Sequence, residues 1–457
     1  MRRLALLGAA LLAGCAAYRP LALPTDDALV RDVARLSVDV ARMPDAALAA
    51  HRFDPSDGLD ITEVAMLAVV NNPDLRRLRA DAGVTRAQAF SAGLLPDPQL
   101  ALTRETAMGS PAGATVAFTA ALTLDIAALL AHSSTRAAAD AESRKTDLEL
   151  LWQEWQTVAK ARLLFVKLDA LDRSLDVLQA QRDKLHGRLD AARRATAAGL
   201  IARDAATPQL AAFEDASRQY NDLERQRNQA RHDLDALLGV APEVTLALTG
   251  SPDIATLDAA GVRAALALAP RRRPDLLALQ AGFEAQDDRY RGALRAQFPA
   301  ITIGPTRGRD TSNVNTAGLS LGITLPLFNR NRGNIAIESA TRDRLRLDYQ
   351  QRLDTDAIES HRLVDEQALL VRQLAEIDAS LPDLALAADR AAKALQAGNI
   401  DALALTAVEG ALLARRLERI ATQQALHEQA IALQALLGTP SNAAAAAAAT
   451  TLGKTSS

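Results

Sequence analysis

The sequence contains few of the residues on which enzymes and metal sites depend. There is one cysteine among 457 residues, which excludes intrachain disulfide bonds and leaves a thiolate-rich metal site without ligands. The six histidines show no pairing at the spacing of helical metal ligands, and the four methionines do not cluster. A phosphate-binding P-loop and a His-Glu-x-x-His motif are also absent. These absences predict a protein that is not an enzyme and that needs no metal or other cofactor.

The chain also lacks a strong excess of charge of either sign. Its formal net charge is −3 at pH 7, with 52 basic and 55 acidic side chains. This balance gives no reason to expect a nucleic-acid partner.

The first residues have the form of an export signal. A basic start, Arg2-Arg3, precedes an apolar run that is too short for an ordinary transmembrane helix. The run ends in Leu-Ala-Gly-Cys at residues 12–15, which resembles a bacterial lipoprotein box. That resemblance implies cleavage after residue 14 and acylation of Cys15, and Ala16 then favours the outer membrane. The alternative is a plain signal peptide with a chance cysteine.

Three short strings occur twice, at an offset of about 200 residues. They are NNPDL and RRPDL (71–75 and 272–276), Ala-Gly (198–199 and 397–398) and LLG (237–239 and 436–438). Because the apolar seams of two long helical segments keep the same offset, the chain reads as a tandem duplication. The expected segments are a signal (1–14), a lipid-anchored stretch (15–58), two repeats (59–250 and 251–438) and an alanine-rich disordered tail (439–457).

Each repeat is predicted to hold a very long helical hairpin. The segment from Ala127 to Thr196 contains no proline, and the segment from Asn334 to Ala397 contains only Pro382. At 1.5 Å per residue such a helix is roughly 100 Å long. Apolar residues that alternate by threes and fours require a partner helix, and a second helical pattern follows each Ala-Gly turn.

A pair of strands is predicted before each hairpin, at about 95–125 and 298–327. In the stretch 316–325, Leu319, Leu321, Ile323 and Leu325 alternate with small or polar residues, and the stretch 115–124 repeats the design. Strands of about ten residues, tilted near 40°, span roughly the 25 Å apolar band of an outer-membrane barrel. Four strands cannot close a conducting barrel, so several chains would have to share one.

The second strand pair ends in Pro-Leu-Phe and passes into Asn-Arg-Asn-Arg-Gly-Asn-Ile-Ala (329–336). This join, RRPDL, the Ala-Gly turns and the LLG endings resemble the TolC-type outer membrane factors, over about residues 59–438. The likeness is strongest to the heavy-metal and cation efflux branch. The first repeat departs from the pattern because Asp125 stands where the second repeat has Pro326.

The resemblance implies a mixed α+β membrane protein. Its fold would be a trimer with a twelve-stranded β-barrel, to which each chain gives four transmembrane strands, continued by an α-helical barrel across the periplasm. The function implied is a passive outer-membrane export duct for metal cations or small toxic compounds. Its partners would be outer-membrane lipid, a periplasmic adaptor protein and an inner-membrane pump of the proton-driven RND type.

The same resemblance assigns roles to particular residues. The hairpin tips, which would contact the adaptor, are Ala198, Gly199, Leu200, Ile201, Ala397, Gly398, Asn399 and Ile400. An acidic ring at the pore mouth is expected from Asp204 and Asp401. The strand-to-helix junction is expected at Pro326, Leu327, Phe328, Arg330 and Arg332, with Pro326 ending the strand because it lacks an N–H.

The alternative hypothesis is a soluble periplasmic coiled-coil lipoprotein, adaptor-like or structural, with no pore. In that case the apolar faces of the strands would pack on each other in a dry interior. Alternation by itself does not separate the two hypotheses.

Overall fold

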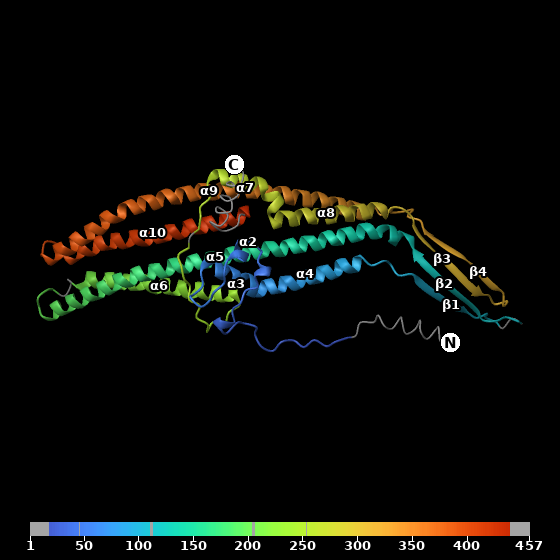
Figure 1. Cartoon of the computed structure of the whole chain (residues 1–457), viewed down its shortest axis with the longest axis horizontal. Coiled ribbons are helices and arrows are strands. Elements are labelled where there is room, and N and C mark those ends of the chain that lie inside the picture. The colour runs from blue at the N-terminus through green and yellow to red at the C-terminus, as the bar shows by residue number, and fades with distance from the viewer. Residues whose placement is uncertain (1–17, 45, 110–112, 203–205, 253, 439–457) are drawn as a thin grey trace.

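The computed structural model describes residues 18–438, except 45, 110–112, 203–205 and 253. The predicted Cys15 anchor, Asp204, the signal and the tail lie outside the described residues. The molecule is elongated, with a β-sheet at one end and the tips of two long helical hairpins at the other (Figure 1). Short helices and the N-terminal segment lie near its middle (Figure 1).

The two repeats have the same order of elements, which are two helices, two strands and a long helical hairpin. The first repeat consists of α3 (Ile61–Asn71), α4 (Pro73–Ala92), β1 (Gln99–Glu105), β2 (Ala117–Asp125), α5 (Ile126–Ala197) and α6 (Thr207–Leu238). The second consists of α7 (Ala259–Arg272), α8 (Pro274–Arg295), β3 (Ala300–Arg309), β4 (Asn315–Thr324), α9 (Arg332–Gln396) and α10 (Ala402–Leu437). The N-terminal segment adds η1 (Val33–Arg35), η2 (Val40–Arg42) and α2 (Ala46–Ala50). This structure confirms the predicted combination of long helical hairpins and four strands.

The repeated strings have local structural roles. In each Pro-Asp-Leu string the proline is the first residue of a helix, α4 or α8, where its missing N–H removes no helical hydrogen bond. In each LLG string the glycine ends the long hairpin with φ near +60° (Gly239) or +64° (Gly438). A left-handed residue at that position favours glycine.

The apolar seam of α5 is the inner face of its hairpin. Its buried leucines are Leu164, Leu168, Leu171, Leu175, Leu178, Leu185 and Leu189. Arg182, which interrupts this seam, lies over the ring of Tyr220 in α6, with 4.5 Å between the guanidinium carbon and the ring centroid. A cation–π contact therefore maintains the packing of α5 against α6 at the position where the arginine interrupts the leucines.

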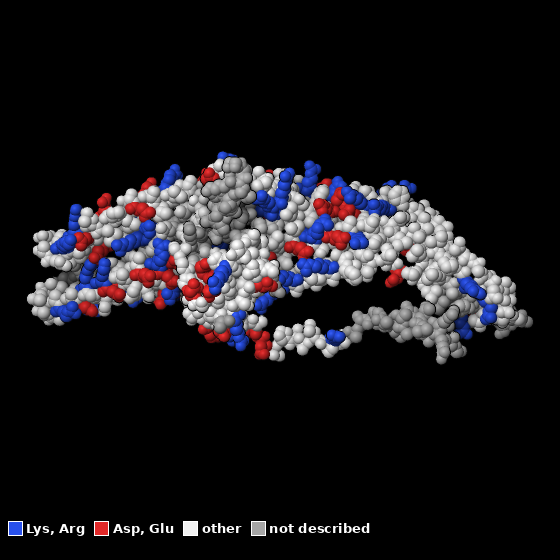
Figure 2. All heavy atoms as spheres, in the orientation of Figure 1, with Lys and Arg blue, Asp and Glu red and all other residues white. Residues whose placement is uncertain are grey.

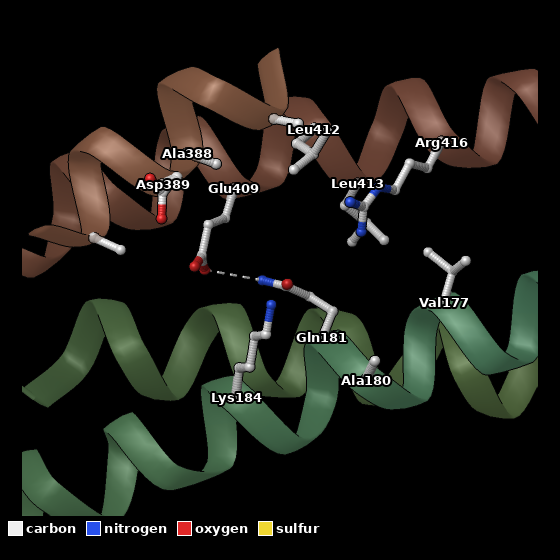
Figure 3. A pocket seen from close by; sticks show the side chains of 12 residues that line it. Val177, Ala180, Gln181, Lys184, Ala388, Asp389, Glu409, Leu412, Leu413 and Arg416 are labelled. Carbon is white, nitrogen blue, oxygen red and sulfur yellow. Dashed lines mark hydrogen bonds between the residues drawn. The ribbon is translucent and has the colours of Figure 1, made fainter. Parts of the chain in front are cut away.

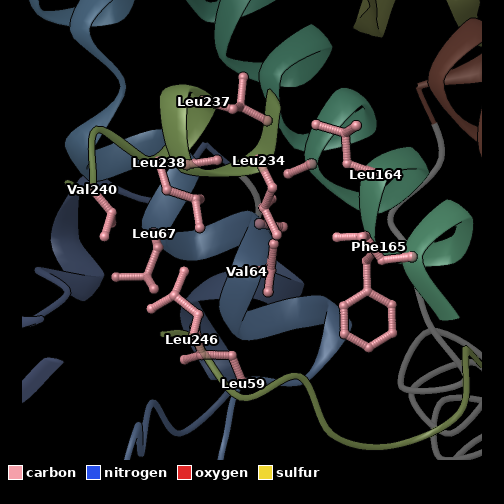
Figure 4. Close-up of a cluster of buried hydrophobic side chains, with 14 of the residues drawn as sticks. Leu59, Val64, Leu67, Leu164, Phe165, Leu234, Leu237, Leu238, Val240 and Leu246 are labelled. Atoms are coloured by element: carbon pink, nitrogen blue, oxygen red, sulfur yellow. The ribbon is translucent and has the colours of Figure 1, made fainter. Parts of the chain in front are cut away.

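The largest described core lies at mid-length, where α3 packs against α5 and α6. Figure 4 shows Leu67 and Val64 of α3 facing Leu234 and Phe165 in this core. The N-terminal segment closes it from outside through two isolated bridges, Val30 with Val240 and Leu59 with Leu248. This segment thus ties the start of the chain to the end of the first repeat.

The four strands form one antiparallel sheet in the order β1-β2-β3-β4. Pairing of β2 with β3 joins the two repeats, and this pairing is interrupted at Gly304 and Pro305 of β3. Proline has no N–H to donate to a ladder, which accounts for the interruption. Among the described residues, no helix combines the length and apolar character needed to cross a lipid bilayer.

We expect replacement of Phe165 by alanine to destabilise the mid-length core by about 3–5 kcal/mol, because a buried aromatic ring is replaced by a cavity. The side chain of Phe165 is 2% exposed. The measurement is the midpoint of thermal unfolding followed by helical circular dichroism in detergent. Leu21→Ala, at a position that is 95% exposed, is the control and should leave the midpoint unchanged. Equal shifts for both variants would contradict the assignment of this core.

Candidate functional site

The sheet has one apolar face that crosses all four strands. Directly opposed residues in antiparallel strands share a face, and the register aligns Leu124 of β2 with Ile303 of β3 and Leu321 of β4. The exposed large apolar side chains of this face are Leu100, Leu102, Phe118, Leu122, Ile301, Ile303, Leu319, Leu321 and Ile323. Nothing in the described part of the chain covers them, so the apolar face is open.

The opposite face carries small and hydroxyl-bearing residues. Its small and hydroxyl-bearing residues include Ala101, Thr103, Thr119, Ala121, Thr123, Thr302, Gly304, Thr306, Gly308, Thr316, Gly318, Ser320, Gly322 and Thr324, and the ends of the strands add Gln99, Glu105 and Asp125. A Cβ at Gly304 would lie 1.6 Å from the carbonyl oxygen of Leu122, and one at Gly322 would lie 2.5 Å from the Thr302 hydroxyl oxygen. The strands therefore approach closely on this face, at positions that exclude any side chain.

Both edges of the sheet are open in the single chain. β1 pairs only with β2, and β4 pairs only with β3. Their outward N–H and C=O groups are available to another strand. In lipid such groups cost several kcal/mol each when unpaired, so the sheet in a membrane requires further strands on both sides.

The two strand-to-helix junctions differ in construction. Asp125 ends β2 and also caps α5, with its carboxylate accepting a hydrogen bond of 3.0 Å from the Ala128 N–H. In the second repeat, β4 ends at Thr324 and α9 starts only at Arg332. Pro326 therefore follows the end of the strand rather than marking it. The N-cap aspartate at the first junction explains why that repeat needs no proline.

The remaining predicted junction residues form an exposed linker. Leu327 and Phe328 are 66% and 99% exposed, and Arg330 and Asn331 have positive φ angles of 45° and 57°. The Asn331 side-chain amide donates a 2.8 Å hydrogen bond to the Ala293 carbonyl oxygen of α8. The linker is thereby anchored to the helices while its aromatic side chain points to solvent.

The two predicted tips have the same backbone geometry. The N–H of Leu200 donates to the carbonyl of Ala195, and the N–H of Gly199 donates to that of Thr196. The same pair of hydrogen bonds recurs at Gly398 and Asn399, and both glycines have φ near +70°. This pattern is a Schellman motif, which requires a left-handed residue at the glycine position.

The tips expose apolar and polar groups at the end of the molecule. The side chain of Leu200 is 78% exposed, and Ile201 is also exposed. Asp401 caps α10, because its carboxylate accepts a 2.7 Å hydrogen bond from the Ala404 N–H. The structure thus gives Asp401 a local capping role, and its predicted partner Asp204 lies outside the described residues.

A groove of about 300 Å³ lies between the two hairpins, near the tips. Figure 3 shows Glu409 of α10 pointing across this groove toward Gln181 and Lys184 of α5. The Glu409 carboxylate accepts hydrogen bonds of 2.6 Å from Arg188 and 3.4 Å from Gln181. The Glu409 side chain is 11% exposed, so this pair is a largely buried link between the two repeats.

The environment of Glu409 favours its charged form. Burial is the largest effect and raises the pKa, but the hydrogen bonds from Arg188 and Gln181 and the charges of Arg188 and Lys184 outweigh it. The pKa of Glu409 is therefore lowered from its ordinary value of 4.5. The link is intact at neutral pH.

A second buried charge network was not predicted from the sequence. Arg273, the residue before the second Pro-Asp-Leu string, is fully buried and pairs with Asp275 at 2.5 Å and with Asp356 of α9 at 2.6 Å. Its guanidinium carbon lies 5.3 Å from the centroid of the Trp152 ring in α5, which Arg352 also approaches. The network joins α5, α8 and α9 near the middle of the molecule.

The described residues also bear on metal ligands and nucleophile motifs. They include no group of three or more His, Cys, Asp or Glu side chains that could hold a metal ion. The sequence Gly-Leu-Ser-Leu-Gly at 318–322 matches the Gly-x-Ser-x-Gly pattern of a hydrolase nucleophile motif. All five residues lie within β4, however, whereas that motif requires a sharp turn from a strand into a helix.

Residues 265–439 match the family model described as "Outer membrane efflux protein". This match covers nearly all of the second repeat. The second repeat therefore resembles outer membrane efflux proteins. The first repeat carries the same order of elements as the matched one. No curated protein matches the sequence.

Solved structures of outer-membrane channels share the fold of this chain. The channel OprN superposes with a TM-score of 0.73 at 17% identity, over 93% of this chain and 99% of that one. The MtrE channel of Neisseria gonorrhoeae, in its open state, superposes with a TM-score of 0.71 at 17% identity, over 93% of this chain and 97% of that one. CusC superposes with a TM-score of 0.70 at 18% identity, over 86% of this chain and 97% of that one.

We expect the Glu409 link to stabilise the paired hairpins only while the carboxyl is charged. Since its pKa is lowered in the folded chain, the stabilisation is present above the ordinary value of 4.5 and is lost as pH falls through the folded pKa. The melting temperature of Glu409→Gln should therefore lie below that of wild type at neutral pH, and the difference should shrink below pH 4.5.

The control for this prediction is Glu418→Gln. Glu418 makes an exposed ion pair with Arg415 one helical turn away, and exposed pairs contribute little to stability. Its melting temperature should follow that of wild type at every pH. A difference for Glu409→Gln that stays constant through the acidic range would show that the charge of Glu409 is not what holds the link.

Proposed function

We propose that this chain is the outer-membrane channel subunit of a tripartite efflux system. In this proposal, three copies form a passive export duct that runs from the cell surface into the periplasm. The observation that carries the proposal is a four-stranded sheet with an open apolar face, a small polar face and two unpaired edges. The match of residues 265–439 to the outer membrane efflux protein family supports it.

The edges are complementary in a ring of copies. β1 of one copy and β4 of the next are both edge strands, and in the antiparallel order they run in opposite directions. Three copies would give twelve strands, with the apolar faces toward lipid and the small faces toward the lumen. Thr, Ser, Ala and Gly side chains then line a wide, polar passage.

The helices have matching free edges. Their order across the layer is α4 with α6, then α5, then α8 with α10, and finally α9. On α9 the exposed apolar residues Ile337, Leu347 and Ile358 recur at about three helical turns, and each is more than 60% exposed. A neighbouring copy that packs on α9 would cover this stripe and continue the helical barrel.

The chain itself has no energy source for transport, so export would be driven by a partner pump. We propose an inner-membrane pump of the proton-driven RND type, joined through a periplasmic adaptor that contacts the tips at Gly199 and Gly398. Support for the tips comes from their identical geometry and the exposed Leu200. The acidic ring of Asp204 and Asp401, the Cys15 lipid anchor and a metal-cation cargo rest on the family resemblance.

The alternative of a soluble lipoprotein without a pore is not favoured. It requires the apolar faces of the strands to pack on each other, and within the described residues they form a single sheet whose apolar face meets no second layer. If the purified protein stays in solution as a monomer without detergent, the channel proposal fails.

We expect single lysine substitutions at two adjacent positions of β4 to have different effects on assembly. Leu321→Lys places a charge on the proposed lipid face, where it costs about 2–4 kcal/mol near the bilayer midplane, and should reduce the amount of assembled trimer in the membrane. Ser320→Lys places the same charge in the lumen. It should leave assembly intact and should shift the ion selectivity of single channels toward anions. Equal loss of trimer in both variants would contradict a two-faced barrel wall.

The adaptor contact predicts a loss of function without loss of assembly. Replacing Gly199 and Gly398 together by valine should abolish resistance to the exported compound, because a branched side chain is strained at positive φ. Trimers should still form in cross-linking. Asparagine, which tolerates the left-handed conformation, should retain more function than valine at both positions.

Gly187→Val is the control for the tip variants, because this glycine lies within α5 and a Cβ there meets nothing within 4 Å. Resistance should persist in that control. Unchanged resistance in the double valine variant would remove the tips from the adaptor interface.

A further inference from the structure

Three arginines lie on the apolar face of the sheet, at the end farthest from the helices. The register aligns Arg104 of β1 with Phe118 of β2, and Phe118 with Arg309 of β3. Arg307 lies in the next row, opposite Ala120. All three arginines are exposed, and Figure 2 shows Lys and Arg atoms gathered at this end of the sheet.

No acidic side chain neutralises this basic row on its own face. Glu105, the last residue of β1, alternates onto the small polar face. Asp310 follows β3, and its carboxylate accepts hydrogen bonds of 2.9 Å from the N–H groups of Ser312 and Val314. Arg104 and Arg307 have no ion pair with any described residue. The Arg309 guanidinium donates one long hydrogen bond of 3.4 Å to the Val116 carbonyl oxygen, which leaves its other N–H groups, with those of Arg104 and Arg307, to bind an external anion.

The arginine rows also border the apolar part of the sheet. Along β4, the apolar residues Leu319, Leu321 and Ile323 span about 13 Å at 3.3 Å per residue, or ~10 Å of height at a tilt near 40°. On the same face, Ala317, opposite Arg307, is the first residue beyond this apolar stretch. The arginines therefore directly adjoin the apolar band rather than standing in open solvent.

We propose that Arg104, Arg307 and Arg309 form a binding site for the phosphate groups of anionic lipid in the outer leaflet. This inference rests on the proposed function, since it requires the apolar face to be in contact with lipid. Guanidinium groups bind phosphate through paired N–H···O hydrogen bonds, and the ring of Phe118 between two of them packs against acyl chains. The site recurs on each subunit and holds an anionic lipid against the seam between the repeats.

Lipid is favoured over a free phosphate ion by the composition of the surface. The basic residues are continuous with an apolar band of Leu and Ile that crosses the whole sheet. A free phosphate ion would use the arginines without the band. A lipid would contact both parts of the surface, with its head group against the arginines and its acyl chains against the apolar band.

The test uses the full-length trimer in a neutral detergent, titrated with phosphatidylglycerol or with phosphatidylcholine of the same acyl chains. Stabilisation is read as the rise in trimer melting temperature with lipid concentration. The variant carries Arg104→Gln, Arg307→Gln and Arg309→Gln, and a second variant carries lysine at the three positions. The matched control carries Arg263→Gln, Arg272→Gln and Arg390→Gln on the helices, where all three side chains are exposed.

We expect wild type to prefer phosphatidylglycerol and the glutamine variant to lose apparent affinity for it on the order of 10- to 100-fold, because each basic residue near an anionic surface contributes roughly fivefold. Phosphatidylcholine should act equally on both proteins. The lysine variant should keep most of the preference, and the helical control should keep all of it. If the triple variant does not assemble, Arg307→Gln alone should reduce the preference about fivefold.

Three results would overturn the inference. They are an unchanged preference in the glutamine variant, an equal loss in the helical control, and equal stabilisation by inorganic phosphate at the same phosphate concentration. The proposed function is judged separately by trimer formation and by insertion into vesicles of phosphatidylcholine alone. A wild type that inserts but shows no preference refutes only the lipid site, whereas one that does not insert refutes both proposals.

Discussion

The organising constraint on this molecule is that backbone N–H and C=O groups at the edge of a sheet must be paired. Within one chain β1 and β4 each have one neighbour, and in lipid the unpaired groups on their outer sides would cost several kcal/mol each. A chain that supplies four strands can satisfy them only with strands from other copies. In the proposed assembly, strands from neighbouring copies satisfy this requirement, and the apolar face of the sheet is then the one that meets lipid. The helical layer repeats the arrangement, since it too ends in two free edges.

Duplication accounts for the shared order of elements in the two repeats. Divergence between the repeats accounts for the different contacts that each makes at the middle of the molecule. The repeats share the order of elements, the Pro-Asp-Leu helix starts and the left-handed glycine ends. They differ where each meets the middle of the molecule. Asn72 caps α4 through a neutral amide and donates to the Leu237 carbonyl, whereas the equivalent Arg273 is buried in an ion network with Asp275 and Asp356. A buried arginine left without its acids is strongly destabilising, so this joint is the less tolerant of the two.

Sequence reasoning succeeded where the signal is local. Period-two alternation identified the strands, the spacing of threes and fours identified the buried seam of α5, and Ala-Gly strings identified both tips. It left open the geometry of the first junction, where Asp125 ends a strand and caps a helix in a single residue. It failed for Glu409 and Arg188, which are separated by 221 residues, and for Arg273. None of these pairings produces a periodic pattern in the sequence, because each depends on two helices that come close only in the folded chain.

The sequence by itself determined which residues share a face of a strand or a helix, because that follows from backbone geometry of fixed period. It also determined where the chain turns, because glycine alone adopts the left-handed conformation at little cost. Only the tertiary structure decided which rows of the four strands align, and therefore that Arg104 and Arg309 flank Phe118 at the far end of an apolar band. The reason is physical: strand register and helix contacts depend on pairings between distant segments, and local propensity does not encode them.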